Sequence, residues 1–146
     1  MSDEPKTSPL GGAPSPGWRI LVVDDEETVR TLAEACILHG LGEQHQALQA
    51  SGGEEALAAA ERDQPDLILL DILMPGIDGF EVCRRLKASP STKDIPIVFL
   101  TALGADKDVE RGLALGGSGY MIKPFNAVTL AAQITELLGP TSERTG

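Results

Sequence analysis

Aromatic residues are scarce in this chain of 146 residues, making up 3% of it although 42% of all residues are hydrophobic. A core must therefore be built mainly from Leu, Ile, Val and Ala, as is usual where helices cover both faces of a parallel sheet. The length suits one ordinary domain with a core of its own. Together these features favour a single domain of the α/β class.

Long apolar runs are also absent. The longest nearly apolar stretch, Ile95 to Leu103, is too short to span a bilayer and is interrupted by Pro96. The N-terminus has no apolar core of the kind that a secretory signal contains. We therefore expect a cytoplasmic protein.

Basic residues are few and nowhere clustered. The chain has 12 Lys and Arg residues against 22 Asp and Glu residues, which gives a formal net charge of -10. This charge repels phosphate backbones and anionic lipids alike. We therefore expect neither nucleic acid nor a membrane as a direct partner.

Cysteine and histidine are rare as well. Cys36 and Cys83 each lie in a helical pattern without a second Cys or a closely spaced His, so neither indicates a metal site. We expect two reduced thiols in or beside the core. His39 is expected at the end of the first helix and His45 in the second strand, and we assign both structural or surface roles.

The two ends of the chain are rich in Pro, Gly and polar residues. Such segments have too little apolar surface to offset the entropy lost on ordering. We expect residues 1–17 to form a disordered tail and residues 139–146 a short C-terminal tail. Residues 18–138 would then form the folded domain.

Between these tails, short β-branched runs alternate with segments of helical length, which is typical of repeated β-loop-α units with parallel strands. The expected strands are Arg19–Val23, Gln44–Gln49, Leu67–Leu70, Ile95–Thr101 and Gly119–Ile122. The expected helices begin near Glu26, Glu54, Gly79, Ala105 and Asn126. The second strand is unusually rich in Gln, which predicts a short or irregular edge of the sheet.

Polar residues follow four of these strands at the point where each apolar run ends. Asp24 and Asp25 follow the first, Asp71 the third, Thr101 ends the fourth, and Lys123 follows the fifth. Ligands of open α/β sheets bind at this edge. Carboxylates gathered there repel each other unless a hard cation such as Mg²⁺ lies between them. With a lysine and a threonine, the set predicts a site for phosphoryl transfer.

The order and spacing of these residues resemble the receiver domains of bacterial two-component response regulators, over essentially all of Arg19 to Leu138. The motifs that carry the resemblance are Val23–Glu26, Asp71–Gly79, Leu100–Ala102 and Gly119–Phe125. The resemblance implies a flavodoxin-like α/β fold. In that fold a doubly wound, five-stranded parallel sheet has the order 2-1-3-4-5 and is covered by five helices.

The resemblance also implies roles for the acidic residues. Asp71 would be the phosphoacceptor, attacking a phosphohistidine on a sensor histidine kinase or a histidine phosphotransfer protein. Asp25 would bind Mg²⁺ directly and Asp24 through water. Asp71 itself and the backbone carbonyl of Leu73 would complete the protein ligands of the metal.

The remaining motif residues would read out the phosphoryl group. Lys123 would pair with one phosphoryl oxygen and Thr101 would donate to another. Thr101 would move inward as it donates, and Tyr120 would follow that movement. The face formed by the fourth helix, fifth strand and fifth helix would then report phosphorylation to an unknown downstream protein or to a second copy. The bond before Pro124 would be cis.

Two further positions are expected to control how long the phosphoryl group lasts. In the family, the residues two beyond the nucleophile and two beyond the threonine admit and orient attacking water. Here these residues are Leu73 and Leu103. Because neither can hydrogen-bond a water, we expect slow self-dephosphorylation.

Other functions fit the sequence less well. An aspartate-nucleophile phosphatase would have a first strand ending in Asp-x-Asp, whereas Asp24 and Asp25 are adjacent. A pseudo-receiver would lack the nucleophile, an acid or the lysine, and a flavin site would need a Ser/Thr-rich loop after the first strand. Because so few residues follow the fifth helix, we expect a stand-alone signalling module that is not an enzyme beyond its own phosphotransfer and dephosphorylation. Taken alone, the acids Asp24, Asp25 and Glu26 could also simply cap the first helix.

Overall fold

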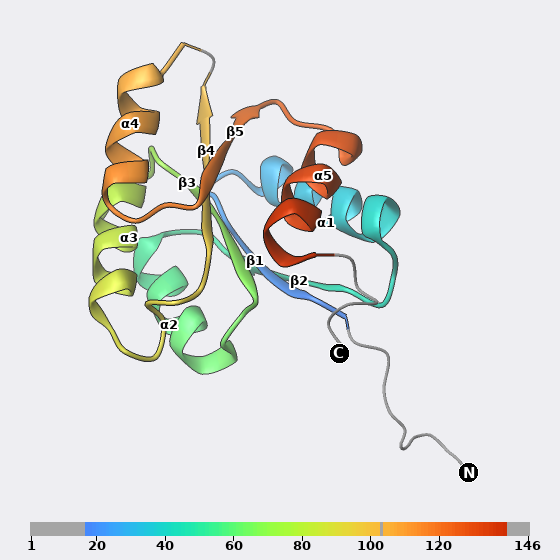
Figure 1. The fold of residues 1–146 in the computed structure, drawn as a ribbon, viewed down its shortest axis with the longest axis horizontal. Coiled ribbons are helices and arrows are strands. Elements are labelled where there is room, and N and C mark those ends of the chain that lie inside the picture. Colours follow the sequence, from blue (N-terminus) through green and yellow to red (C-terminus); the bar gives the residue numbers. More distant parts are fainter. Residues whose placement is uncertain (1–16, 103, 140–146) are drawn as a thin grey trace.

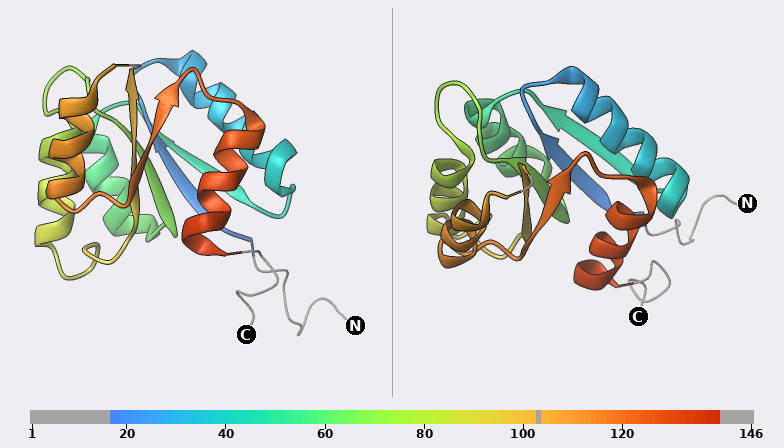
Figure 2. Two further views of the ribbon diagram at one scale, coloured as in Figure 1. Left: turned by 45° about the horizontal axis from the view of Figure 1, so that its top comes forward. Right: turned by 90° about the horizontal axis from the view of Figure 1, so that it is seen from above.

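Five parallel strands form one sheet in the computed structural model, which describes residues 17–102 and 104–139. The strands are β1 (Arg19–Val23), β2 (Gln46–Ala50), β3 (Leu67–Asp71), β4 (Ile97–Ala102) and β5 (Gly119–Lys123). Their order is β2-β1-β3-β4-β5, which confirms the predicted topology. Because all strands are parallel, their carboxyl ends meet at one edge of the sheet (Figure 2).

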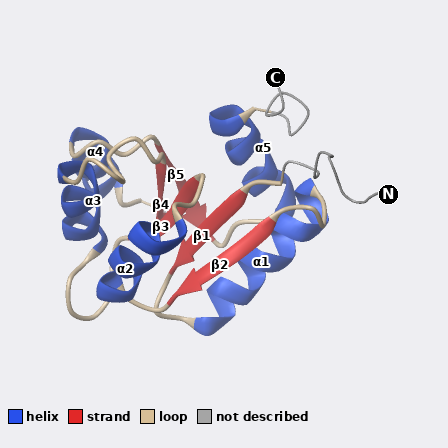
Figure 3. Cartoon of the chain, turned by 90° about the horizontal axis from the view of Figure 1, so that it is seen from below, coloured by secondary structure: helices blue, strands red, loops and turns tan. Residues whose placement is uncertain are grey.

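Five helices connect the strands and cover both faces of the sheet. They are α1 (Glu27–Leu41), α2 (Gly53–Asp63), α3 (Gly79–Ala88), α4 (Asp106–Ala114) and α5 (Ala127–Leu138). Helices α1 and α5 lie on one side, and α2, α3 and α4 lie on the other (Figures 1 and 3). In the part of the chain that the structure describes, no helix is long and apolar enough to cross a membrane.

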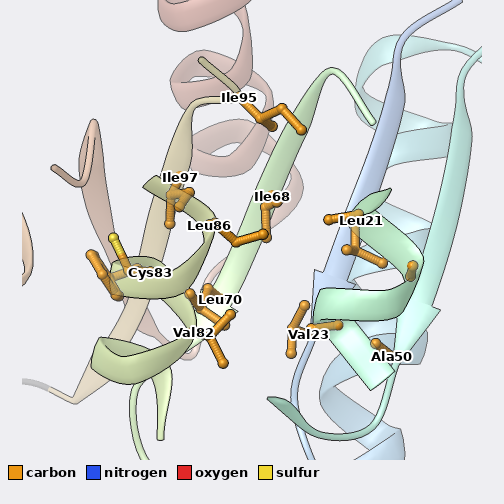
Figure 4. Close-up of a cluster of buried hydrophobic side chains, with 14 of the residues drawn as sticks. Leu21, Val23, Ala50, Ile68, Leu70, Val82, Cys83, Leu86, Ile95 and Ile97 are labelled. Carbon is orange, nitrogen blue, oxygen red and sulfur yellow. The ribbon is translucent and has the colours of Figure 1, made fainter. Parts of the chain in front are cut away.

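The strands are apolar on both faces because each face is covered. Along β1, Leu21 and Val23 belong to the core under α2 and α3, whereas Ile20 and Val22 belong to the core under α1 and α5. The first of these cores is shown in Figure 4. All five residues of β3 are buried, as expected for the central strand of a doubly wound sheet.

The two cysteines lie in these two different cores. Cys83 of α3 packs in one core (Figure 4), and Cys36 of α1 packs in the other. Both are free and buried, as predicted. Since the sheet separates them, they cannot form a disulfide with each other.

The prediction of a short or irregular β2 was wrong. Each of its five residues is in register with one residue of β1, from Gln46 opposite Arg19 to Ala50 opposite Val23. The strand begins at Gln46, so His45 lies before it. His45 is buried, and its Nδ1 atom accepts a hydrogen bond of 2.8 Å from the backbone N–H of Trp18.

The start of β4 was also predicted too early. The strand begins at Ile97, two residues after the predicted start at Ile95. Pro96 cannot donate a ladder hydrogen bond, although its carbonyl accepts one of 3.0 Å from Ile68. The paired part of β4 therefore starts after the proline.

Helix α4 lies directly on the ring of Phe99. Gly112 is the buried residue of this helix, and a Cβ atom built on it would lie 2.7 Å from the Cε2 atom of Phe99. A Cβ atom on Gly117, just after the helix, would lie 2.6 Å from the same atom. This close approach explains why glycine occupies both positions.

Candidate functional site

Asp24 is fully buried at the end of β1, and each of its polar atoms has a partner. Its N–H donates to the carbonyl of Ala50 at 3.2 Å, and its own carbonyl accepts from Arg30 at 2.8 Å. The carboxylate accepts from the Glu26 N–H at 2.9 Å and from Lys123 at 3.2 Å. The N-cap residue of α1 is Glu26, and no side chain makes a capping hydrogen bond there, so helix capping does not account for the contacts of Asp24.

Asp71 is the last residue of β3 and is only 4% exposed. Its Oδ1 atom lies 3.1 Å from the Nζ atom of Lys123. Burial, followed by the negative charge of Asp24, raises the pKa of Asp71 to about 6. Lys123 and the backbone N–H of Leu73 act in the opposite direction and stabilise the carboxylate.

Lys123 ends β5 and reaches past the end of β4 to contact acids on two other strands. Its ammonium group lies 3.1 Å from Asp71 and 3.2 Å from Asp24. Burial acts to lower the pKa of Lys123, but the charges of these carboxylates and their hydrogen bonds raise it above the ordinary value. The side chain is therefore a fixed positive charge between two buried acids.

Asp25, next to the ion-paired Asp24, is exposed. One carboxylate oxygen from each of Asp24, Asp25 and Asp71 lies within 4.8 Å of the others. Three hard oxygen donors gathered in this way, with a single lysine to balance them, suit a divalent cation such as Mg²⁺. The acidic residues predicted from the sequence fit that cation.

A pocket of about 280 Å³ opens above these carboxylates. Predicted residues in its lining are Asp25, Asp71, Leu73, Thr101 and Lys123. Thr101 is 4% exposed, and among the described residues its hydroxyl group has no hydrogen-bond partner. The pocket therefore offers an ammonium group and an unused hydroxyl group to a bound anion, beside carboxylates that a cation would have to balance.

Two predicted residues lie elsewhere. Tyr120 of β5 is 44% exposed and lines a second hollow, of about 570 Å³, between β5 and α5. Pro124 lines the same hollow, and the Lys123–Pro124 peptide bond is cis. Leu103 lies outside the described residues.

Two other residues near the acids were not predicted from the sequence. Asp108 lines the pocket from the first turn of α4, and Glu26 of the predicted Val23–Glu26 motif lines it as well. Arg30 donates to the Asp24 carbonyl from α1. An acid in a first helical turn and an arginine on a helix are ordinary surface features, so the sequence carried no signal for either.

Comparison with known proteins identifies the class. The family model described as the response regulator receiver domain matches residues 20–135, and the chain belongs to that family. It is 47% identical to the response regulator PleD of Caulobacter vibrioides over 119 residues, which are 82% of this chain and 26% of PleD. The chain spans about half or less of the length of the first curated relatives, from 26% for PleD to 51% for a ycf27 regulator of Cyanophora paradoxa.

Solved structures agree with this assignment. A response regulator from Chloroflexus aurantiacus matches with a TM-score of 0.78 and 34% identity, covering 84% of this chain and 98% of that one. The chemotaxis protein CheY4 of Vibrio cholerae matches with a TM-score of 0.77 and 30% identity, covering 84% and 99%. Receiver domains take phosphoryl groups from histidine kinases and generally depend on Mg²⁺.

Proposed function

We propose that this chain accepts a phosphoryl group on Asp71 from a sensor histidine kinase or a histidine phosphotransfer protein in the cytoplasm. The observation that carries the proposal is the buried Asp71 carboxylate, which contacts Lys123 and lies among the acids of the β1 end. Family membership supports the same reaction class. The chain would act as a phosphoacceptor and not as an enzyme with a separate substrate.

In the reaction, a carboxylate oxygen of Asp71 attacks phosphorus, and the N–P bond of the phosphohistidine breaks as the new O–P bond forms. The imidazole leaves with the electron pair. Lys123 already contacts the carboxylate and would neutralise one oxygen of the transferred group. The unpartnered hydroxyl of Thr101 would donate to another oxygen.

The carboxylates of Asp24, Asp25 and Asp71, with the backbone carbonyl of Leu73, would hold Mg²⁺. When bound, this cation supplies positive charge that offsets the charge of the phosphoryl oxygens. Asp71 must be ionised to attack. Lys123 favours that form, whereas burial and the charge of Asp24 oppose it.

The output would be a change of the face formed by α4, β5 and α5. Thr101 lies at the end of β4, beside β5, and is directly in register with Ile122. Tyr120 and Ile122 are both exposed on β5. A Thr101 hydroxyl drawn towards the phosphoryl group would bias Tyr120 between exposed and buried positions. A downstream protein or a second copy of the chain would bind the altered face.

The test is direct. The protein is incubated with acetyl phosphate or phosphoramidate and Mg²⁺, and its intact mass is measured with and without EDTA. We expect one added phosphoryl group with Mg²⁺, and none with EDTA or in Asp71→Asn. An unmodified parent protein, or equal labelling of the variant, would contradict the proposal.

A further inference from the structure

Arg30 forms a bridge between the acid pair and the Gln-rich edge strand. Its Nη1 atom donates to the carbonyl of Asp24 at 2.8 Å, and its Nε atom donates to Oε1 of Gln49 at 3.1 Å. The Gln49 amide in turn donates to Glu34 of α1 at 3.4 Å. One guanidinium group thus connects the turn after β1 with β2, and Gln49 continues the connection to α1.

The hydrogen bond from Arg30 to the Asp24 carbonyl restrains the backbone of the next residue, Asp25. The carbonyl of Asp24 and the N–H of Asp25 belong to one planar peptide group, so a bond to that carbonyl fixes the orientation of the whole group. The preceding peptide group is fixed by the bond from the Asp24 N–H to Ala50. Both backbone dihedral angles of Asp24 are therefore restrained by neighbours on β2 and α1.

Asp25 depends on this restraint more than the other acids do. Among the described residues, its exposed carboxylate has no hydrogen-bond or ion-pair partner, whereas Asp24 and Asp71 are both held by Lys123. The place of its side chain therefore depends on its backbone. Two side-chain contacts restrain that backbone, the Asp24 carboxylate at the Glu26 N–H and Arg30 at the Asp24 carbonyl, and Arg30 is the one that comes from α1.

We propose that Arg30 is a positioning residue for the cation site, and that Gln49 holds Arg30 in place. Through the Asp24 carbonyl, Arg30 keeps the acid pair in the arrangement that gathers three carboxylates within 4.8 Å. This role gives a reason for a polar, Gln-bearing β2, which packing against β1 does not require. The inference rests on the proposed cation site and concerns its geometry, not the phosphoryl transfer.

The experiment measures binding of Mn²⁺ alone, by the loss of its free EPR signal, with no phosphodonor present and with Mg²⁺ as competitor. Arg30→Met is expected to raise the Kd by about tenfold, as loss of an outer-shell contact commonly does. The Kd of Arg30→Lys is expected to lie between those of Arg30→Met and the parent. An ammonium group can still donate to the Asp24 carbonyl, but it lacks the second guanidinium N–H that reaches Gln49.

Gln49→Leu and Gln46→Leu form a matched pair on the same exposed edge. Both residues lie on β2 and both are exposed, but only Gln49 contacts Arg30. We expect Gln49→Leu to weaken Mn²⁺ binding and Gln46→Leu to leave it unchanged. Thermal unfolding by circular dichroism shows whether each variant is folded, and Arg30→Lys and Gln49→Leu carry the test if Arg30→Met is not.

Each outcome decides a separate question. If the folded Arg30 variants bind Mn²⁺ as the parent does, or if the two Gln variants are indistinguishable, the positioning role is wrong. If the parent does not bind Mn²⁺, or if Asp25→Asn binds it equally well, the cation site of the proposed function fails instead. The two failures are therefore distinguishable.

Discussion

The Nζ atom of Lys123 lies 3.1 Å from the Oδ1 atom of Asp71 and ties the last residue of β5 to the last residue of β3. The same ammonium group lies 3.2 Å from Asp24. One lysine thus compensates two buried carboxylates, which leaves the group with an excess of negative charge. That excess accounts for the affinity expected for a cation, and it adds to burial, the larger cause, in raising the pKa of Asp71.

The raised pKa of Asp71 makes the stability of the cation-free protein depend on pH. The folded protein binds this proton more tightly than the unfolded chain, since the pKa rises from 3.8 to about 6. The stabilisation is complete below the unfolded value and is lost as pH rises through about 6. In EDTA, Asp71→Asn should therefore gain about 1.4 kcal/mol over the parent between pH 5 and pH 8, because only about one pH unit of this window lies below the folded pKa of about 6.

Urea denaturation at several pH values checks this prediction. Asp106→Asn is the control, because Asp106 is an exposed acid in the first turn of α4. Its difference from the parent should stay constant over the same range. A constant difference for Asp71→Asn as well would contradict the prediction.

Lys87 should stabilise the loop between α3 and β4. Its Nζ atom donates to the carbonyls of Lys93 and Ile95, at 2.9 and 2.8 Å. Lys87→Met removes both bonds from a half-buried group and should lower the free energy of unfolding by about 1–2 kcal/mol. Lys93→Met, which removes an exposed side chain but leaves both carbonyls paired, should have little effect in the same urea titration. Equal losses in the two variants would refute the role of Lys87.

How far the sequence predicts the site depends on which contacts hold each residue. Asp71 and Lys123 were predicted because they directly follow apolar strands, and strand ends converge in any parallel sheet. Arg30 and Asp108 were not, because their roles arise from the packing of helices whose sequence patterns are those of an ordinary surface. Leu103 lies outside the described residues, so its predicted place at the site stays untested.

The sheet likewise has one feature that was predicted and one that was not. The order of the sheet followed from the resemblance, but the regularity of β2 did not follow from its composition. A Gln-rich strand pairs well here because it is in register with β1 along its whole length, while the side chains of Gln46 and Gln49 are exposed, one on each face of the sheet. Pairing with β1 outweighed the low intrinsic preference of this sequence for a β-strand.

Gly112 should resist substitution because α4 rests on Phe99. Gly112→Ala would gain about 1 kcal/mol from helix propensity. It would also place a methyl group 2.7 Å from an aromatic carbon. We expect a net loss of about 1–3 kcal/mol, as in other overpacked cores.

A double-mutant cycle with Phe99→Leu tests the cause. In the Phe99→Leu background, the smaller side chain leaves room for the methyl group, so Gly112→Ala should cost little or become stabilising. The measured coupling between the two changes should then be large. Additive effects in thermal or urea unfolding would show that the contact with Phe99 is not the reason for the glycine.

Leu73 should make the phosphoryl group long-lived. Its side chain is 74% exposed and lines the pocket beside Asp71, where it cannot hydrogen-bond an attacking water. We expect a half-life of minutes or longer after the donor is removed, followed by intact mass. Leu73→Asn should shorten it several-fold, because an amide can orient the water for attack. Leu32→Asn, at an exposed leucine of α1 away from the pocket, should leave the half-life unchanged. A half-life of seconds in the parent protein would overturn the prediction, since water would then reach the phosphoryl group without help from a polar side chain at residue 73.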